Sequence, residues 1–422
     1  SRFIQEYPEL SGSLPFDEIA PFVQSLVMPR KMMLMVPAGD ALDALIEDLL
    51  PHLSEGDILI DGGNSHYEKT KMRAEQLQTK GIHLIGAGVS GGEEGALKGP
   101  SIMPGGEKHV YDQVAPYLEK IAAKDKNKLP CCTYIGPGGS GHFVKMVHNG
   151  IEYVEMQLLA EVYYLLKNMG HEPIEISDIL SSWQEKENSY LLDITIDILK
   201  KKEGEAWLIE KILDKAGNKG TGNWTTVVTA ELGIPSTLIA TALFARYTSF
   251  HKEDRIRAEK QFKQQQSSAL KLDTEDILNA YSFARIVNHH QGFVLLKETS
   301  SHYQWNLNLS ELARIWTQGC IIRSTLMEHL VKLFQNHKKI LNEPLYISAI
   351  NSLKPAIKKV AIEALMSELD LPCMTASISF MNSYATANSA ANIIQAQRDY
   401  FGAHSYQRND EDSGKYHHTR WN

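Results

Sequence analysis

The chain has 422 residues, of which 43% are hydrophobic and 22% are charged, and its formal net charge is −8 at pH 7. This composition is typical of a globular protein, and the length allows two or three domains. The negative charge argues against a nucleic-acid-binding protein, and no apolar run is long enough to cross a membrane. The four cysteines lack metal-ligand spacing and favour a reducing compartment, so we expect a cytoplasmic protein.

Residues 31–138 alternate between segments typical of strands and segments typical of helices. Strands are expected at Lys31–Val36, Asp57–Asp61 and Ile82–Ile85, and helices at about 41–50 and 67–80. Alternation at these lengths predicts an α/β domain with a parallel sheet and right-handed crossovers. Glycine-containing stretches follow all three strands, and we expect them to be loops at the carboxyl edge of the sheet, where such sheets bind ligands.

The first 30 residues lack the element that opens a complete dinucleotide-binding domain. Such a domain begins with a strand, a Gly-x-Gly-x-x-Gly turn and a helix. The residues before Lys31 hold four prolines and no such pattern. We therefore expect residues 1–138 to form a Rossmann-like domain without its first strands, and further residues of the parent protein to precede Ser1.

From Gly139 onwards the pattern becomes helical. We expect a large all-α domain over residues 139–386, followed by a helix end and a polar tail over residues 387–422. The tail carries aromatic residues such as Tyr406 and Trp421 among few other apolar ones. This composition indicates docking onto another surface, such as a partner subunit.

One stretch, Phe143–Tyr153, places polar residues at helical spacing within an apolar sequence. Lys145, His148, Asn149 and Glu152 stand at i, i+3, i+4 and i+7, so they share one helix face. A buried lysine and glutamate require a partner or a ligand. They lie roughly 10 Å apart along the helix axis, which suits holding a small substrate from both ends. Two separate structural ion pairs are the alternative, and the spacing alone does not decide.

Other polar groups are candidates for the same site. Asn64 follows a strand and offers an amide, and Ser90 with its two following glycines offers a hydroxyl and backbone N–H groups to an anion. Ordinary turn chemistry is the alternative for both. Lys219 begins a Gly-rich loop, but no strand precedes it, so this loop is not a Walker A motif. Arg246 lies in an apolar helix, where a structural ion pair is the alternative.

The histidines give no metal-binding pattern. His289-His290 and His417-His418 are adjacent pairs and lack the i, i+4 spacing of a helical zinc site. We therefore expect no bound metal ion.

Several motifs together carry a resemblance to a known family. They are Asp61–Ser65, Gly88–Gly95, Gly99–Gly106, Lys145–Tyr153, Lys219–Gly222, Gly319–Ser324 and Ile394–His404. In this order they closely resemble the 6-phosphogluconate dehydrogenases, the decarboxylating enzymes of the pentose phosphate pathway, over nearly the whole chain from Lys31.

The resemblance implies a reaction and two catalytic residues. It implies that a homodimer oxidises and decarboxylates 6-phospho-D-gluconate to D-ribulose 5-phosphate and CO2, with reduction of NADP to NADPH. Lys145 would be the base at the C3 hydroxyl and then the acid that polarises the new ketone. Glu152 would protonate C1 of the enediol. These roles require a lowered pKa for Lys145 and a raised pKa for Glu152.

The resemblance also implies the binding residues. At the carboxylate and hydroxyl end of the substrate these are Asn64, Ser90, Gly91, Gly92, His148 and Asn149. At the phosphate end they are Tyr153, Lys219, Thr221, Arg246 and Arg398, joined by His404. Arg398 and His404 would come from the partner subunit, so the site would be complete only in a dimer. NADP would contact Val36, Ala38 and Asn64.

The sequence departs from the family at its cofactor-binding residues. The N-terminal strand, the Gly-rich turn and the Asn-Arg-Thr that reads the 2′-phosphate are missing, and Pro37 replaces a lysine. NADP rather than NAD therefore rests on the resemblance alone. Two other functions are compatible with the motifs. One is a non-catalytic dimer that binds sugar phosphates, and the other is a relative of the 3-hydroxyacid dehydrogenases, which would not need Lys219, Arg246 or Arg398.

Overall fold

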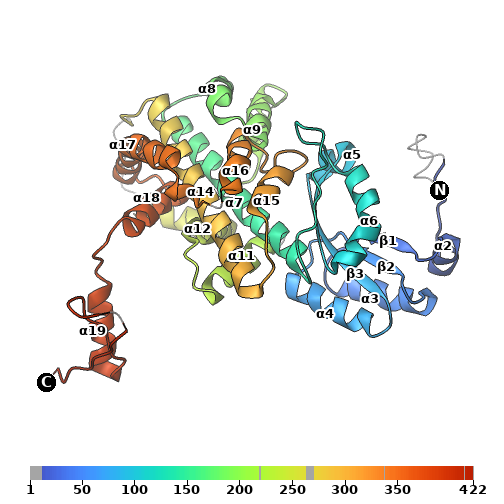
Figure 1. The fold of residues 1–422 in the computed structure, drawn as a ribbon. Coiled ribbons are helices and arrows are strands. Elements are labelled where there is room, and N and C mark those ends of the chain that lie inside the picture. Colours follow the sequence, from blue (N-terminus) through green and yellow to red (C-terminus); the bar gives the residue numbers. More distant parts are fainter. Residues whose placement is uncertain (1–11, 218–219, 263–269, 337, 413, 422) are drawn as a thin grey trace. The chain divides into compact units, whose positions relative to one another are not determined.

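The computed structural model describes residues 12–217, 220–262, 270–336, 338–412 and 414–421 (Figure 1). The chain divides into two compact units, Ser1–Ser377 and Ile378–Asn422. The first unit holds the α/β region and most of the helices.

A four-stranded sheet organises the α/β region. Its strands are β1 (Lys31–Leu34), β2 (Ile58–Asp61), β3 (His83–Ser90) and β4 (Ser101–Gly105), in the order β1-β2-β3-β4. The first three strands are parallel, as predicted, with Lys31 opposite Ile58 and Ile58 opposite His83. The fourth strand runs antiparallel to β3 and was not predicted.

The third strand corrects one prediction. Gly86–Ser90 continues β3, although we expected these residues to form a loop after the strand. A Cβ atom on Gly88 would overlap the Cβ of Lys145, and one on Gly86 would overlap Thr70. The glycines therefore permit close packing of helices on the strand, and the extended conformation is stabilised by contacts far apart in the sequence.

Helices cover both faces of the sheet, so strand β2 is buried on both sides, whereas the edge strand β1 is partly exposed (Figure 1). Side chains alternate between the two faces, as the period of a strand requires. Ile58 and Ile60 of β2 pack with helix α6 (Lys108–Ile121), whereas Leu59 packs with α3 (Asp40–Leu49). The remaining helices of this region are α2 (Ile19–Ser25), η2 (Leu50–His52), α4 (Tyr67–Gln78) and α5 (Gly92–Lys98).

The rest of the first unit is helical, as predicted. Its helices are α7 (Ser140–Asn168), α8 (Pro173–Glu187), α9 (Tyr190–Lys200), α10 (Leu208–Lys211), α11 (Thr221–Glu231), α12 (Thr237–Phe250), α13 (Lys252–Phe262), α14 (Thr274–Tyr303), α15 (Leu309–Ile315), α16 (Thr325–Gln335), η3 (Ile340–Asn342) and α17 (Pro344–Met366), and α18 (Pro372–Tyr384) begins in this unit and ends in the second. One small correction to the all-α prediction is a hairpin of β5 (Lys202–Glu203) and β6 (Ala206–Trp207). Gly204, with φ of 64°, opens its two-residue turn, a position that favours glycine.

The long helices α7 and α14 are joined by a buried ionic network. Arg285 Nε of α14 donates to Glu155 Oε2 of α7 at 2.7 Å, and Asn288 Nδ2 donates to Glu155 Oε1 at 2.9 Å. Arg285 also pairs with Glu187. Because each buried charge has partners, the network fixes the rotation and register of α7.

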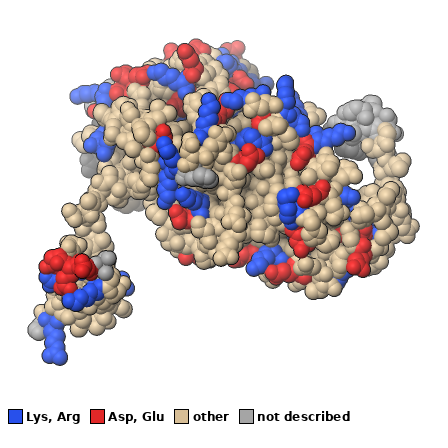
Figure 2. Space-filling view, viewed as in Figure 1, with Lys and Arg blue, Asp and Glu red and all other residues tan. Residues whose placement is uncertain are grey.

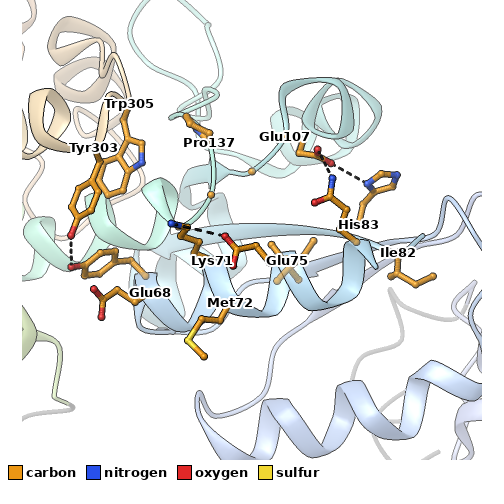
Figure 3. A pocket seen from close by; sticks show the side chains of 17 residues that line it. Glu68, Lys71, Met72, Glu75, Ile82, His83, Glu107, Pro137, Tyr303 and Trp305 are labelled. Atoms are coloured by element: carbon orange, nitrogen blue, oxygen red, sulfur yellow. Dashed lines mark hydrogen bonds and ion pairs between the residues drawn. The ribbon is translucent and has the colours of Figure 1, made fainter. Parts of the chain in front are cut away.

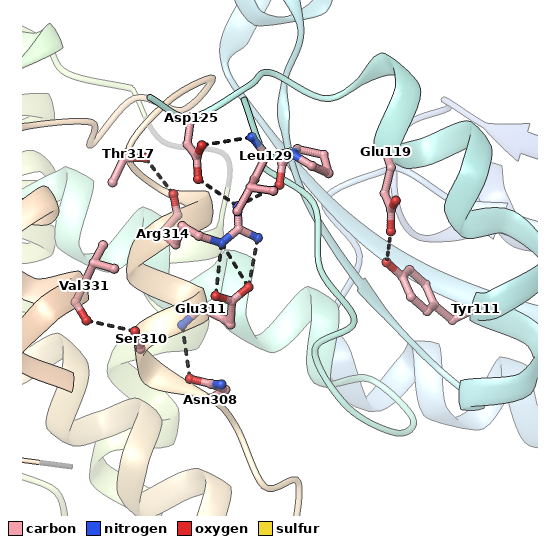
Figure 4. Close-up of polar contacts among 11 residues, drawn as sticks. Tyr111, Glu119, Asp125, Leu129, Asn308, Ser310, Glu311, Arg314, Thr317 and Val331 are labelled. Carbon is pink, nitrogen blue, oxygen red and sulfur yellow. Dashed lines mark hydrogen bonds and ion pairs between the residues drawn. The ribbon is translucent and has the colours of Figure 1, made fainter. Parts of the chain in front are cut away.

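A second polar contact joins the α/β region to the helical region (Figure 4). Arg314 Nη1 of α15 donates to Asp125 Oδ2 at 3.2 Å and to the Pro130 carbonyl at 2.9 Å. The same guanidinium also donates through Nε and Nη2 to Glu311 Oε2. Charge-assisted contacts of this kind hold α15 against the loop that follows α6.

The second unit contains the helix α19 (Ala391–Gly402) and the tail that folds back on it. The helix ends at Gly402, as predicted, and Ala403 takes the left-handed conformation with φ of 49°. Asp399 is fully buried and its carboxylate is the centre of this unit. Oδ1 accepts from Ser405 N and His418 Nδ1, both at 2.9 Å, and Oδ2 accepts from Thr419 N at 3.0 Å and Trp421 Nε1 at 2.9 Å.

In the described part of the chain, none of the helices combines the length and the apolar composition that crossing a bilayer requires. Acidic and basic side chains are interspersed on the visible face of the first unit (Figure 2). This face presents no broad basic patch of the kind that binds nucleic acid.

Candidate active site

The amino-terminal end of α7 packs unusually closely on strands β3 and β4. A Cβ atom on Gly141 would overlap the carbonyl oxygens of Met103 and Gly86. Together with Gly88, which faces Lys145, this glycine lets the helix approach the strand backbones. As a result, Lys145 lies against Gly88 of β3, close to the end of the strand at Ser90.

The polar face predicted on α7 is present as one connected cluster. Lys145 Nζ donates to Asn149 Oδ1 at 2.7 Å and lies 3.4 Å from His148 Nδ1. His148 Nδ1 lies 3.6 Å from Glu152 Oε2, so the imidazole stands between the lysine and the glutamate. The surrounding helix is buried on nearly all sides. The four side chains therefore form one connected polar cluster and not two separate ion pairs.

Burial shifts the pKa values of the cluster in opposite directions. It lowers the pKa of Lys145, although the charges of Glu152 and Cys320 partly offset this effect. It raises the pKa of Glu152, although Lys145 and Arg246 act against the shift. The pKa of His148 falls well below its ordinary value because of burial and the neighbouring lysine. Burial thus shifts both Lys145 and Glu152 toward their neutral forms on one helix face.

The turn after β3 lies beside this cluster. Ser90 Oγ lies 3.2 Å from His148 Nε2, within hydrogen-bond distance. Gly91 has φ of 132°, and a Cβ there would lie 2.7 Å from the Gly319 carbonyl oxygen, so only glycine fits. Gly92 begins α5. Ser90 thus joins the turn to the α7 face, whereas Gly91 lies against Gly319 and Gly92 against Ile321.

Two residues of the site were missed by the sequence analysis. Trp316 is fully buried, and its ring centroid lies 5.4 Å from that of His148. Cys320 is also buried, donates to the Trp316 carbonyl at 3.1 Å and lies near enough to Lys145 to affect its pKa. The Gly319–Ser324 motif pointed to this segment, but no spacing rule assigns it to α7.

A cationic group lies at the other end of the face. The guanidinium carbon of Arg246 lies 3.6 Å from the centroid of the Tyr153 ring, a cation–π contact. Arg246 Nη1 donates to the Gly217 carbonyl at 3.1 Å. Gly222 of α11 packs on the same tyrosine ring. Arg246 and Tyr153 are therefore together, and in place of the structural ion pair considered as the alternative for Arg246 there are contacts with a carbonyl and a ring.

Four other predicted residues, all assigned to the phosphate end, lie at or before the start of α11 or in the second unit. Thr221 is the first residue of α11, next to Gly220 and Gly222. Lys219 lies outside the described residues. Arg398 is exposed on α19 and donates to Gln395 Oε1 at 3.0 Å, and His404 is exposed after the end of that helix. Both belong to the second unit.

The predicted cofactor residues lie at the carboxyl ends of β1 and β2. Val36 and Ala38 follow β1, and Asn64, which is exposed, follows β2. A Cβ on Gly63 would lie 3.1 Å from the Val36 carbonyl oxygen, so the two loops are neighbours. Such a parallel edge is where α/β sheets bind nucleotides, and small residues leave its backbone accessible.

Comparison with known proteins decides the family. The NAD binding domain of 6-phosphogluconate dehydrogenase matches residues 5–136, and the C-terminal domain of 6-phosphogluconate dehydrogenase matches residues 141–421. The chain belongs to the 6-phosphogluconate dehydrogenase family. The family predicted from the motifs is thus confirmed.

Relatives within the 6-phosphogluconate dehydrogenase family align over nearly the whole chain. The NAD(+)-dependent, decarboxylating enzyme of Bacillus subtilis is 45% identical over 96% of this chain and 89% of its own length. The NADP(+)-dependent, decarboxylating enzyme of the same organism is 44% identical over 100% of this chain and 91% of its own length. Because the identities to the two relatives are similar, overall sequence similarity does not show whether this chain uses NAD or NADP.

A solved member of the 6-phosphogluconate dehydrogenase family has the same fold. The enzyme of Plasmodium falciparum, described in its apo form, with NADP+ and with 6-phosphogluconate, superposes with a TM-score of 0.91 at 39% identity. The match covers 96% of this chain and 89% of that one. The predicted fold, a Rossmann-like domain followed by a large helical domain, is therefore confirmed.

Proposed function

We propose that this chain catalyses the oxidative decarboxylation of 6-phospho-D-gluconate to D-ribulose 5-phosphate and CO2, with NADP as the electron acceptor. The observation that carries the proposal is the α7 face, where a lysine with a lowered pKa and a glutamate with a raised pKa flank one imidazole. Family membership and the relatives named for this reaction support the substrate.

Lys145 is the general base of the proposed reaction. In its neutral form its Nζ accepts the proton of the C3 hydroxyl as that carbon is oxidised. The lysine is then cationic and polarises the new C3 carbonyl, which stabilises the electrons left when the C1 carboxylate departs as CO2. Asn149, which accepts a hydrogen bond from Nζ, holds the amine in place for both steps.

Glu152 is the acid that completes the reaction. Loss of CO2 leaves an enediol, and C1 must gain a proton to give the ketose product. Burial favours the protonated carboxyl of Glu152, which can donate that proton. The glutamate stands two turns from Lys145, so the two groups reach different carbons of one substrate.

The remaining polar groups bind the two ends of the substrate. Asn64, Ser90, Gly91, Gly92, His148 and Asn149 hold the carboxylate and hydroxyl end. Tyr153, Lys219, Thr221 and Arg246 hold the phosphate, with Arg398 and His404 from a partner subunit. The support for Arg246 is that it is buried and that, within the described residues, it contacts a carbonyl, a thioether and a ring but forms no ion pair with a carboxylate, which leaves its charge available to an anion.

The cofactor is proposed to bind at the edge formed by Val36, Ala38 and Asn64. NADP, when bound, accepts the hydride from C3 of the substrate. The neighbouring loops after β1 and β2 supply the accessible backbone that such binding needs. The name of the NADP(+)-dependent relative and the described NADP+ complex of the Plasmodium falciparum enzyme support NADP as the cofactor.

Three further predictions are parts of this proposal. The enzyme is a homodimer whose residues 387–422 complete the site of the partner subunit, it is located in the cytoplasm, and its domains divide at about residues 138 and 386. The tail supports the first of these, because Ile394, Tyr400 and Phe401 expose large apolar surfaces that a partner would cover.

The test is an activity assay on the purified chain. We expect NADPH to appear only when 6-phosphogluconate and NADP+ are both present, with ribulose 5-phosphate and CO2 formed in equal amounts. Absence of product with either NADP+ or NAD+, together with binding of 6-phosphogluconate in calorimetry, would instead indicate a sugar-phosphate-binding protein without catalysis.

A further inference from the structure

A second group of titratable side chains lies in the α/β region, outside the proposed active site. His83 begins β3, Glu107 is the N-cap of α6, and His109 lies in the first turn of that helix. One ligand atom from each side chain lies within 4.8 Å of the other two. His83 Nδ1 and Glu107 Oε2 are 3.2 Å apart.

We propose that His83, Glu107 and His109 bind one divalent transition-metal ion of the zinc type. Two imidazoles and a carboxylate are a donor set that zinc takes in proteins. Ligand atoms around a tetrahedral zinc ion with bonds of about 2.0–2.1 Å lie roughly 3.3 Å from one another. The His83–Glu107 separation already has this value. The imidazole of His109 is exposed, so it has room to move into the position of the third ligand.

The backbone and a neighbouring amide hold these ligands in position. His83 lies in strand β3 and His109 in the first turn of α6, so packed elements fix the backbones of these two ligands. Gln78 Nε2 of α4 donates to Glu107 Oε1 at 3.2 Å, which leaves Oε2 directed to His83 (Figure 3). A ligating carboxylate whose second oxygen is hydrogen-bonded in this way is oriented before the metal binds.

The proposed site borders a cavity. His83 and Glu107 line a cavity of about 620 Å³, whose far wall includes the stacked rings of Tyr303 and Trp305, 4.7 Å between centroids (Figure 3). None of the lining residues belongs to the proposed active site. A metal held here would take water, or the anionic oxygen of a ligand in the cavity, as its fourth ligand.

The test is isothermal titration calorimetry of the untagged, chelator-treated full chain with Zn²⁺ alone, followed by the visible spectrum with Co²⁺. We expect a micromolar site of one ion per chain and the intense absorption of tetrahedral Co²⁺. His109→Gln removes one ligand at the surface and should weaken that site by about tenfold or more, and Gln78→Leu should weaken it by roughly tenfold.

The matched control is His171→Gln. His171 Nδ1 also lies near a carboxylate, 3.8 Å from Glu175 Oε2, but this pair has no third ligand in the described chain. The control should leave the affinity and the stoichiometry unchanged. Equal Zn²⁺ binding by the wild type and His109→Gln, absence of a micromolar site in the wild type, or a loss in His171→Gln that matches the loss in His109→Gln would each overturn the proposal.

Discussion

The proposed catalytic site draws on two regions that are built differently. The α7 face is fixed by burial, by close helix–strand packing at Gly88 and Gly141 and by the ionic network of Arg285. In the second unit, Arg398 and His404 are exposed, and the turn beside them is held by the single carboxylate of Asp399. Burial suits groups whose pKa values must shift, whereas exposed groups suit a phosphate that must enter and leave.

The largest expected effect comes from removing the buried amine. Lys145→Met should lower kcat by about 10³- to 10⁴-fold, because both the base and the cation that polarises the carbonyl are lost. Calorimetric binding of 6-phosphogluconate should weaken far less. Lys167→Met on the exposed end of the same helix is the control and should leave kcat unchanged. Near-normal turnover without Lys145 would remove it from the mechanism.

The network beneath the α7 face should be the main contributor to stability. Arg285→Leu leaves Glu155 buried without its cation and should lower the free energy of unfolding by about 3–5 kcal/mol. Denaturant unfolding measures this change. Arg257→Leu removes an exposed arginine paired with Asp254 and should have little effect. Equal losses in the two variants would show that the buried network has no special role.

Replacing the proposed acid should slow a single step. Glu152→Gln keeps the shape of the side chain but cannot donate a proton, so kcat should fall by about 10²-fold. In D₂O the wild type should place deuterium at C1 of ribulose 5-phosphate with one stereochemistry. Loss of that stereochemistry in the variant identifies Glu152 as the donor, whereas an unchanged rate and stereochemistry exclude it.

The smallest effect is expected in the second unit. Asp399→Asn turns one acceptor oxygen into an amide that faces N–H donors, so the turn that carries His404 should loosen. The KM for 6-phosphogluconate should rise by roughly tenfold, because one or two charge-assisted contacts with the substrate are lost. The KM for NADP+ should stay constant. Asp410→Asn, at an exposed pair with Arg408, is the control. Equal changes in both KM values would point to general unfolding.

Local periodicity predicted the α7 face well. The positions of Lys145, His148, Asn149 and Glu152 follow from the helical repeat, and their contacts agree with that prediction. The same reasoning misread Gly86–Ser90 as a loop, because the unpredicted strand β4 pairs with these residues and α7, far along the chain, packs on their glycines. Trp316 and Cys320 were missed for the same reason, since only the tertiary fold brings them to His148 and Lys145.

The opposite pKa shifts of Lys145 and Glu152 are the central claim, and the pH profile of kcat/KM tests them most directly. Activity should require Lys145 without its proton, at a pKa below its ordinary 10.5, and Glu152 with its proton, at a pKa above its ordinary 4.5, so the profile should have an acidic limb from Lys145 and an alkaline limb from Glu152. Glu152→Gln should keep the acidic limb and lose the alkaline one. An alkaline limb that survives unchanged in this variant, or a wild-type profile without an acidic limb, would contradict the proposed pairing of base and acid.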